Sequence, residues 1–318
     1  MILSYPAIAD LNRDRYPVHT LRCLFEDKEP KMSTQAPYIV TGGNAGIGKA
    51  IAKSLAEKQK HVVIVSRDPK KGRIACEELR EQTGHQQIDF VQGRLDSIEE
   101  VHTLAQTLST QYPTIQCLIN NAGVWMTSHK QTEDGLEWTY MVNHLAPFLL
   151  TRWLIPQLQQ ATDARIVNVN AGLYVFGTYD PERTPYGKDF HRMRTYADSK
   201  LCNILFTIEC AKRLEGSGIT INAVHPGVIR TGLGITNDLV SKFVSFLKLF
   251  WKSPQKGADA PVWLATSDEI KDISGAYFDL RKQTPFNEAA SQQEARLRCW
   301  EQSEAFLPTT FTLPPLPA

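Results

Sequence analysis

The chain has 318 residues, with 35 basic and 34 acidic side chains and a formal net charge of +1. This length allows one large α/β domain, and the balanced charge gives no general attraction to nucleic acid or to anionic lipid. Its 6 cysteines include no CxxC pair, and no cluster of His and Cys has metal-ligand spacing, which favours free thiols and no metal site.

Residues 1–36 show no clear hydrophobic period and are interpreted as an N-terminal extension, either outside the core fold or packed on it. Asp10, Arg13 and Asp14 lie where the apolar core of a signal peptide would have to be. No run in the chain approaches the ~18 apolar residues of a membrane span. We therefore expect a cytoplasmic location.

From residue 37 onward, short apolar segments alternate with helical segments. Strands are predicted at 38–40, 61–65, 88–91, 117–120, 165–169, 220–224 and 275–278, and helices around 50–55, 74–79, 98–110, 135–160 and 194–214. This alternation predicts the α/β class, with a doubly wound parallel sheet in a single domain over 37–306. Ligands of such sheets bind at the carboxyl ends of the strands. The Pro- and Thr-rich residues 307–318 are expected to form an irregular or disordered C-terminal tail.

A glycine-rich turn follows the first strand, with the sequence Thr41-Gly42-Gly43-Asn44-Ala45-Gly46-Ile47-Gly48. The glycines allow the backbone to turn tightly and to approach a pyrophosphate, and the helix that follows points its N–H groups and positive dipole end at that anion. Such a stretch alone could be a plain turn. Its place between a strand and a helix is the context that indicates dinucleotide binding.

The spacing Gly-x-x-x-Gly-x-Gly, together with Glu133-Asp134-Gly135-Leu136-Glu137 and Asn143-His144-Leu145, resembles the short-chain dehydrogenase/reductase family. The likeness covers about residues 37–306 and is closest to the retinol-dehydrogenase-like branch. It implies a Rossmann fold, an oxidoreductase that uses a nicotinamide cofactor, and a homodimer or homotetramer. It also implies that the cofactor is contacted by the turn residues Gly42, Asn44, Gly46, Ile47 and Gly48.

The second strand ends in Ser66-Arg67-Asp68, at the position that separates NAD from NADP binding. NAD-binding domains usually carry an acid there, and NADP-binding domains carry a cation for the 2′-phosphate. Arg67 can pair with that phosphate and stack on adenine. NADP(H) is therefore favoured, with NAD(H) as the alternative if Asp68 turns inward. Lys49 is either a second cation for the phosphate or a solvated helix residue.

The resemblance places further cofactor contacts after other strands. After the third strand, relatives usually carry Asp-Leu, whereas this chain has Arg94-Leu95-Asp96, so Asp96 substitutes from one position later or the contact is absent. After the fourth strand, the resemblance assigns sheet-stabilising and ribose-flanking roles to Asn121, Ala122 and Gly123. After the sixth strand, it assigns contacts with the nicotinamide end to Pro226, Gly227, Val228 and Thr231.

Tyr196 and Lys200 lie on one face of a predicted helix. A neighbouring ammonium is expected to lower the pKa of the phenol from about 10, so that the tyrosine exchanges a proton with a carbonyl or alcohol oxygen. In the family this is the Tyr-x-x-x-Lys pair, which also contacts the cofactor through the nicotinamide ribose. Asn143 matches the family Asn that supports a proton-relay water, although it could instead be a helix-kink residue.

The serine that orients the substrate oxygen in the family is missing. Counting back 25 positions from Tyr196 gives Ala171, within Val167-Asn168-Val169-Asn170-Ala171-Gly172. Alanine has no hydroxyl to donate. Three interpretations stay open: Asn170 or Tyr174 supplies the hydrogen bond, the enzyme works slowly without it, or the protein binds cofactor without redox turnover.

Residues 236–252 have apolar side chains at 240, 243, 244, 247 and 251, which predicts an amphipathic helix. By resemblance, the segment of about 228–255 is the substrate lid, and an apolar lid implies a lipophilic substrate. A dimer contact and a helix on a membrane surface are the alternatives. Candidates for pocket lining, or for core, are Trp125, Tyr174, Phe176 and Phe243.

The sequence thus predicts an NADP(H)-dependent oxidoreductase that interconverts a carbonyl and an alcohol on a lipophilic small molecule, such as an aldehyde, a ketone, or a retinoid- or steroid-like compound. The alternative is a cofactor-binding regulatory or scaffold protein with weak or no turnover, for which Ala171 is the reason.

Overall fold

The computed structural model describes residues 35–227 and 253–317, all of which belong to one compact unit. The predicted N-terminal extension, apart from its last two residues, lies outside the described residues. So does most of the predicted lid, including Phe243.

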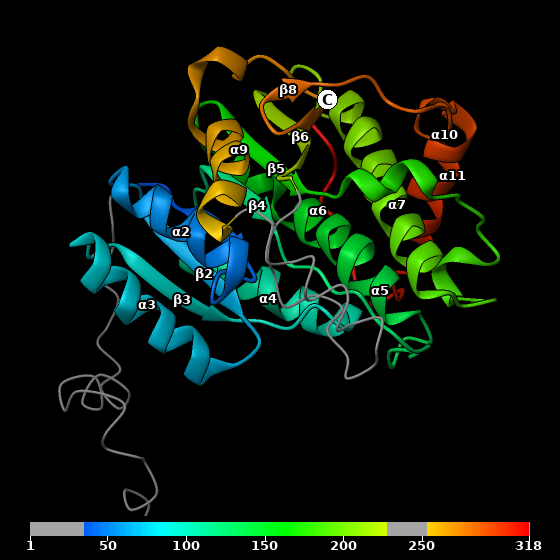
Figure 1. The fold of residues 1–318 in the computed structure, drawn as a ribbon, viewed down its shortest axis with the longest axis horizontal. Coiled ribbons are helices and arrows are strands. Elements are labelled where there is room, and N and C mark those ends of the chain that lie inside the picture. Colours follow the sequence, from blue (N-terminus) through cyan, green and yellow to red (C-terminus); the bar gives the residue numbers. More distant parts are fainter. Residues whose placement is uncertain (1–34, 228–252, 318) are drawn as a thin grey trace, which may run out of the picture. The chain divides into compact units, whose positions relative to one another are not determined.

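The centre of the described unit is a sheet of 8 strands in the order β3-β2-β1-β4-β5-β6-β7-β8 (Figure 1). The strands from β1 to β7 pair in parallel, and β8 pairs antiparallel with β7. Because the first half of the chain builds one side of β4 and the second half builds the other, the predicted doubly wound sheet is confirmed. The strands are β1 (Tyr38–Thr41), β2 (Val62–Ser66), β3 (Ile88–Gln92), β4 (Cys117–Asn120), β5 (Ala164–Val169), β6 (Ile219–His225), β7 (Tyr277–Asp279) and β8 (Lys282–Gln283).

Helices cover both faces of the sheet, as the buried runs of apolar residues in its strands require. One apolar core lies under α2 (Gly46–Glu57), α3 (Pro69–Thr83) and α9 (Pro254–Thr266). The other lies under α4 (Ile98–Gln111), α6 (Ala146–Leu158), α7 (Arg192–Arg213) and α11 (Gln293–Ala305). No helix in the described ranges is both long and apolar enough to cross a membrane. The sequence analysis did not predict β8, α9, α10 (Glu288–Ser291) or α11.

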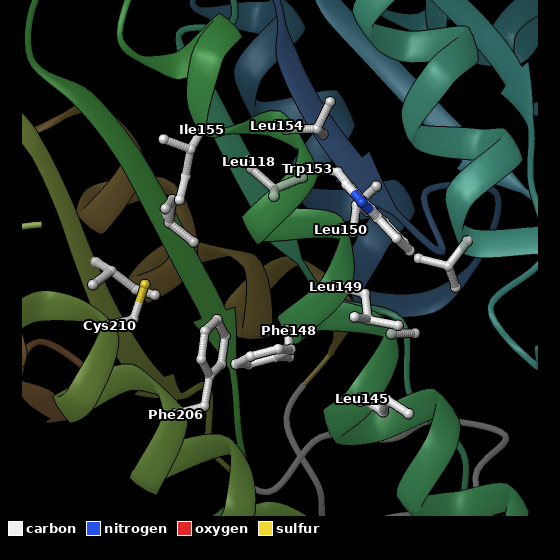
Figure 2. Close-up of a cluster of buried hydrophobic side chains, with 14 of the residues drawn as sticks. Leu118, Leu145, Phe148, Leu149, Leu150, Trp153, Leu154, Ile155, Phe206 and Cys210 are labelled. Atoms are coloured by element: carbon white, nitrogen blue, oxygen red, sulfur yellow. The ribbon is translucent and has the colours of Figure 1, made fainter. Parts of the chain in front are cut away.

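The second core is built largely around α6, whose side chains are buried along most of its length. Figure 2 shows Leu149, Leu150 and Leu154 of this helix packed near Leu118 of β4. Phe148 of α6 meets Phe206 of α7 edge to face, with ring centres 5.3 Å apart. Because α7 carries the predicted catalytic pair, this packing fixes the position of the catalytic helix relative to the sheet.

The long helix predicted at about 135–160 begins later than expected and is not uniform. Gly135 has a φ of 74°, which ends any helical path there, and Glu137 caps the helix by accepting a hydrogen bond from the Tyr140 N–H at 2.8 Å. A short turn, α5 (Trp138–Tyr140), leads into a π-helical turn, η2 (Met141–Leu145), and then into α6. Asn143 therefore lies in a π-turn, a feature that is frequent at functional sites.

The chain after α11 has neither helix nor strand, but it is packed against the fold. The Thr312 carbonyl accepts a hydrogen bond from the Trp153 indole at 3.0 Å, and the Pro314 carbonyl accepts one from Arg152 at 3.4 Å. The Phe311 ring lies 4.2 Å from the His102 ring of α4. The tail backbone is irregular and is held against α4 and α6.

Candidate active site

The glycine-rich turn joins β1 to α2 at the carboxyl end of the sheet. The Gly42 and Gly43 N–H groups both donate to the Val65 carbonyl of β2, at 2.9 and 3.2 Å. At Gly48 a Cβ atom would lie 2.3 Å from the Gly42 carbonyl oxygen, so only glycine allows α2 to start this close to the turn. Gly46 has a φ of 55° and open space where its side chain would be. The turn therefore leaves its outer side accessible at Gly46.

The N-terminus of α2 differs from those of the next two helices. Asp68 caps α3 and Ser97 caps α4, each by accepting a hydrogen bond from a first-turn N–H. The residue before α2 is Ala45, which has no side-chain oxygen, and the first turn of α2 contains no acid. Uncapped N–H groups with the positive end of a helix dipole attract an anion. The turn therefore suits an anion such as the pyrophosphate of a dinucleotide, and the contacts of Asn44, Ile47 and the glycines beside them stay predictions.

The loop after β4 is bonded directly to the end of β1. The Thr41 hydroxyl accepts hydrogen bonds from the backbone N–H groups of Asn121 and Ala122, both at 3.0 Å. The Asn121 amide nitrogen donates to the Thr41 carbonyl at 2.9 Å. These contacts hold the two strand ends that should flank the adenosine ribose, so Asn121 and Ala122 have a structural role whether or not they touch cofactor.

The end of β2 presents Arg67 to solvent, and within the described ranges Arg67 forms no ion pair. Ser66 is buried, and its hydroxyl accepts a hydrogen bond from the Asp68 N–H at 3.3 Å. The Asp68 carboxylate accepts from the Lys71 N–H at 3.0 Å, and this hydrogen bond lowers the pKa of Asp68. Asp68 is thus engaged as a helix cap, and Arg67 is the charged side chain left at this strand end.

Two other charged side chains considered for the cofactor are already paired. Lys49 forms an ion pair with Glu78 of α3. Asp96 receives both Nε and Nη2 of Arg94, at 3.0 and 2.7 Å. Leu95, between Arg94 and Asp96, is partly buried against the core. The Asp96 carboxylate is thus already paired with Arg94, and both alternatives for the predicted adenine contact stay open.

Tyr196 and Lys200 project from α7 as predicted, and both are buried. The Lys200 ammonium lies 5.8 Å from the centre of the Tyr196 ring and donates to the Val169 carbonyl at 3.2 Å. Burial raises the pKa of Tyr196 to about 12 and lowers the pKa of Lys200 to about 8. Burial thus acts on the pKa of Tyr196 in the direction opposite to the effect expected from Lys200, and the lowering by Lys200 stays a prediction.

Asn143 joins the loop after β4 to the catalytic helix. Its Oδ1 accepts from the Val124 N–H at 2.7 Å, and its Nδ2 donates to the Val124 carbonyl at 2.9 Å and to the Ser199 hydroxyl at 3.1 Å. A Cβ atom on Gly123 would lie 3.3 Å from the Asn143 Oδ1 and 3.7 Å from the Lys200 Nζ. Asn143, Gly123 and Lys200 therefore meet at one point, beside Tyr196.

The loop after β5 has no side-chain hydroxyl in the expected position. Ala171 is extended, with a φ of −138°. Asn170 donates its amide nitrogen to the Lys200 carbonyl at 3.1 Å, and its Oδ1 has no hydrogen-bond partner among the described residues. Tyr174 is buried edge to face on Tyr277, with ring centres 4.9 Å apart. Burial raises the pKa of Tyr174.

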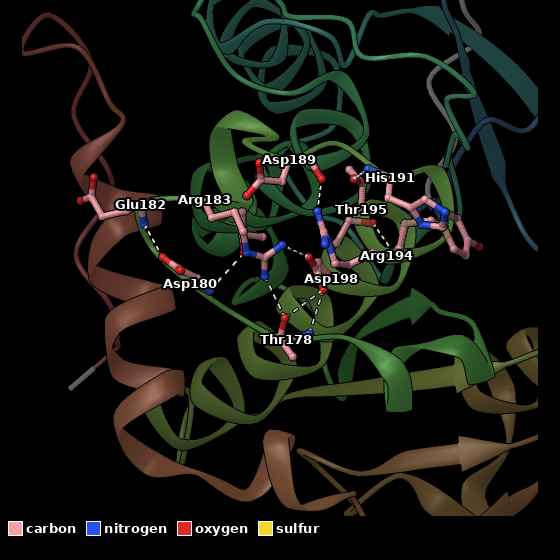
Figure 3. Close-up of polar contacts among 12 residues, drawn as sticks. Thr178, Asp180, Glu182, Arg183, Asp189, His191, Arg194, Thr195 and Asp198 are labelled. Atoms are coloured by element: carbon pink, nitrogen blue, oxygen red, sulfur yellow. Dashed lines mark hydrogen bonds and ion pairs between the residues drawn. The ribbon is translucent and has the colours of Figure 1, made fainter.

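An ion pair that the sequence analysis missed fixes the start of α7. Asp198 lies between Tyr196 and Lys200, is only 2% exposed, and accepts from the Thr178 N–H at 2.8 Å. Arg183 donates to Asp198 at 2.7 Å and to the Thr178 hydroxyl at 2.8 Å, and Figure 3 shows the three side chains converging. A sequence signal existed, since a buried acid inside a catalytic helix requires a partner, but the partner itself was not identifiable.

The last predicted cofactor contacts follow β6. Pro226 is buried, and Gly227 has a φ of 88°, a conformation that favours glycine. Val228 and Thr231 lie outside the described residues. The described part of the chain contains no group of three or more His, Cys, Asp or Glu that could hold a metal ion.

Comparisons with known proteins agree with this geometry. The family model described as short chain dehydrogenase matches residues 37–239. Retinol dehydrogenase 13 of Mus musculus is 37% identical over 273 residues, covering 83% of this chain and 81% of the relative. Retinol dehydrogenase 12 of Homo sapiens is 35% identical over 287 residues, covering 89% of this chain and 91% of the relative.

Solved structures share the fold. A crystal structure of a putative uncharacterized protein from Mycobacterium paratuberculosis has a TM-score of 0.70 and 26% identity, covering 88% of this chain and 95% of that one. A putative short chain dehydrogenase from Escherichia coli, complexed with NADPH, has a TM-score of 0.61 and 22% identity, covering 78% of this chain and 97% of that one.

Proposed function

This chain belongs to the short-chain dehydrogenase family, and from that premise we propose that it is an NADPH-dependent reductase of lipophilic aldehydes or ketones. The observation that carries the proposal is the convergence of Tyr196, Lys200 and Asn143 at one point, next to a strand end suited to a dinucleotide.

NADP(H) is the cofactor that the strand ends fit best. Arg67 is exposed at the end of β2, where a 2′-phosphate would lie, and Asp68 is occupied as the cap of α3. A bidentate pair between a guanidinium and a phosphate is among the stronger polar contacts in proteins. The structural relative from Escherichia coli, complexed with NADPH, is consistent with this choice.

We propose reduction as the direction of the reaction, with Tyr196 as the proton donor. With a pKa of about 12, the Tyr196 phenol carries its proton at neutral pH. When bound, NADPH would supply the hydride that the carbonyl carbon of the substrate accepts. Tyr196 gives its proton to the carbonyl oxygen, which becomes the alcohol hydroxyl, and is then reprotonated from solvent. The Lys200 ammonium favours the transient phenolate that Tyr196 becomes.

We propose that neither Asn170 nor Tyr174 replaces the missing serine. The Asn170 amide nitrogen is directed to the Lys200 carbonyl, and Tyr174 is packed on Tyr277. We therefore propose that Tyr196 alone contacts the substrate oxygen. Losing one such donor costs roughly 10²–10³ in rate, so turnover is expected to be slow.

The exposed apolar side chains of the described residues support an apolar substrate. Among the described residues, the exposed large apolar side chains are Val175 and Phe176, which follow Ala171, and Met193 at the start of α7. The named relatives are retinol dehydrogenases, so a retinoid-like aldehyde is a substrate to test first. The cytoplasmic location and the homodimer or homotetramer stay predictions.

The test is NADPH consumption by the purified full-length protein with a panel of retinal, aliphatic and aromatic aldehydes, and steroid ketones. Tyr196→Phe is the control, because it keeps the ring and removes the proton donor. We expect turnover that falls at least about 10²-fold in this variant, with NADPH affinity unchanged. NADPH binding without turnover on any substrate would instead support a cofactor-binding regulator, the alternative to which Ala171 points.

A further inference from the structure

The loop after β4 contacts the catalytic helix a second time, at Trp125. The indole of Trp125 is stacked on the Tyr196 ring, with ring centres 4.7 Å apart and planes inclined by 17°. Its indole N–H donates to the Arg192 carbonyl at 2.9 Å. Arg192 and Tyr196 are one helical turn apart on α7, so the indole spans that turn.

The backbone that carries Trp125 is itself held in place. Both polar groups of Val124 are bonded to the Asn143 side chain, at 2.7 and 2.9 Å. Gly123, two residues before Trp125, lies against the Lys200 ammonium. The loop thus faces both members of the catalytic pair, with Gly123 at Lys200 and Trp125 at Tyr196.

Nothing else in the described residues fixes the Tyr196 hydroxyl. It has no hydrogen-bond partner there, and the family serine that would share the substrate oxygen with it is Ala171. The orientation of the ring therefore depends on ring packing. Offset stacking between aromatic side chains is a favourable, orientation-dependent contact.

We propose that Trp125 is a positioning residue for catalysis, whose stacked indole holds the Tyr196 ring so that its hydroxyl meets the substrate oxygen. The proposal rests on the proposed reductase function. Trp125 would then supply part of the positioning that the serine hydroxyl is expected to supply in the family. The loop after β4 would position Tyr196 as well as the nucleotide.

The test compares Trp125→Leu and Trp125→Phe with a matched control, Trp263→Leu. Trp263 is also partly buried, also donates its indole N–H, to Glu269 at 3.1 Å, and also packs on an aromatic ring, that of Phe278, but on the opposite face of the sheet. We expect Trp125→Leu to lower kcat about 10-fold with the KM for NADPH unchanged. Trp125→Phe keeps a stacked ring and should stay within about 3-fold of the wild type. Equal kcat values for Trp125→Leu and Trp263→Leu would overturn the proposal.

A second measurement is independent of turnover. The protein is labelled with 3-fluorotyrosine, and the fluorine resonance of Tyr196 is assigned by its absence in Tyr196→Phe. Loss of the indole ring current should move this resonance in Trp125→Leu and much less in Trp125→Phe, and an unmoved resonance in Trp125→Leu overturns the proposal. A wild type without turnover on the whole panel would count against the proposed function, and the resonance would still decide whether Trp125 holds the ring.

Discussion

The loops after β4 and β5 leave neighbouring strands at the same edge of the sheet, yet the polar groups of the two loops differ in their hydrogen bonding. After β4, Thr41 and Asn143 bond the backbone of Asn121, Ala122 and Val124. After β5, Asn170 makes one side-chain hydrogen bond, its Oδ1 has no partner within residues 35–227 and 253–317, and the next residue is alanine. The loop after β4 thus keeps its hydrogen bonds although the loop after β5 has alanine in place of the expected serine. Separate contacts stabilise the two loops.

The largest expected effect is on the free energy of unfolding, and it differs between variants of two buried asparagines. Asn143→Leu leaves the Val124 N–H and carbonyl without partners and should lower the free energy of unfolding by about 3 kcal/mol. Asn170→Leu removes one hydrogen bond and should cost about 1 kcal/mol. Urea denaturation of both variants measures the difference. Equal losses would mean that the two loops are not held differently.

The next prediction concerns NADPH binding at the end of β2. Arg67→Asp replaces the free cation with an acid and should raise the Kd for NADPH about 50-fold, while the Kd for NADH changes less than about 3-fold. Lys49→Ala is the matched control, because Lys49 is paired with Glu78 and should matter little. Fluorescence titration with both cofactors gives the affinities. A similar loss of NADPH affinity in both variants would show that Arg67 has no special role.

The substrate side is tested by restoring the hydroxyl. Ala171 is extended, a conformation open to serine, so Ala171→Ser should raise kcat about 10-fold or more by adding a donor to the substrate oxygen. Gly172→Ala is a control of similar size, since its Cβ would make ordinary contact with His225, at 3.5 Å. If Asn170 or Tyr174 already fills the role, Ala171→Ser will change the rate little.

The smallest expected effect is a pH dependence of kcat. It arises from Lys200, whose ammonium lies near both loops. Because burial lowers the pKa of Lys200 to about 8, its ammonium is present below that pH and is lost as the pH rises through it. The kcat for reduction should therefore fall to half near pH 8. Lys200→Arg stays charged at high pH, so its residual activity should show no such decline. A midpoint above pH 10 in the wild type would contradict the effect of burial.

Local patterns predicted the elements that hold the site. The apolar runs at Tyr38, Val62 and Ile88 are strands within about a residue of their expected bounds, because buried parallel strands need continuous apolar side chains. The helix that carries Tyr196 was also predicted, because apolar side chains recur along it with a helical period. The edge strand β8, of two exposed residues, and α10 are too short to leave such a pattern.

The sequence by itself determined the sheet, the glycine-rich turn and the spacing of Tyr196 and Lys200, because each depends on neighbours within a few residues. Only the tertiary structure decided which side chains are free. Lys49 is paired with Glu78, 29 positions away, and Trp125 lies on Tyr196 from a different strand end. It also decided that burial raises the pKa of Tyr196, since desolvation depends on the atoms that surround the phenol and not on the residues beside it in the chain.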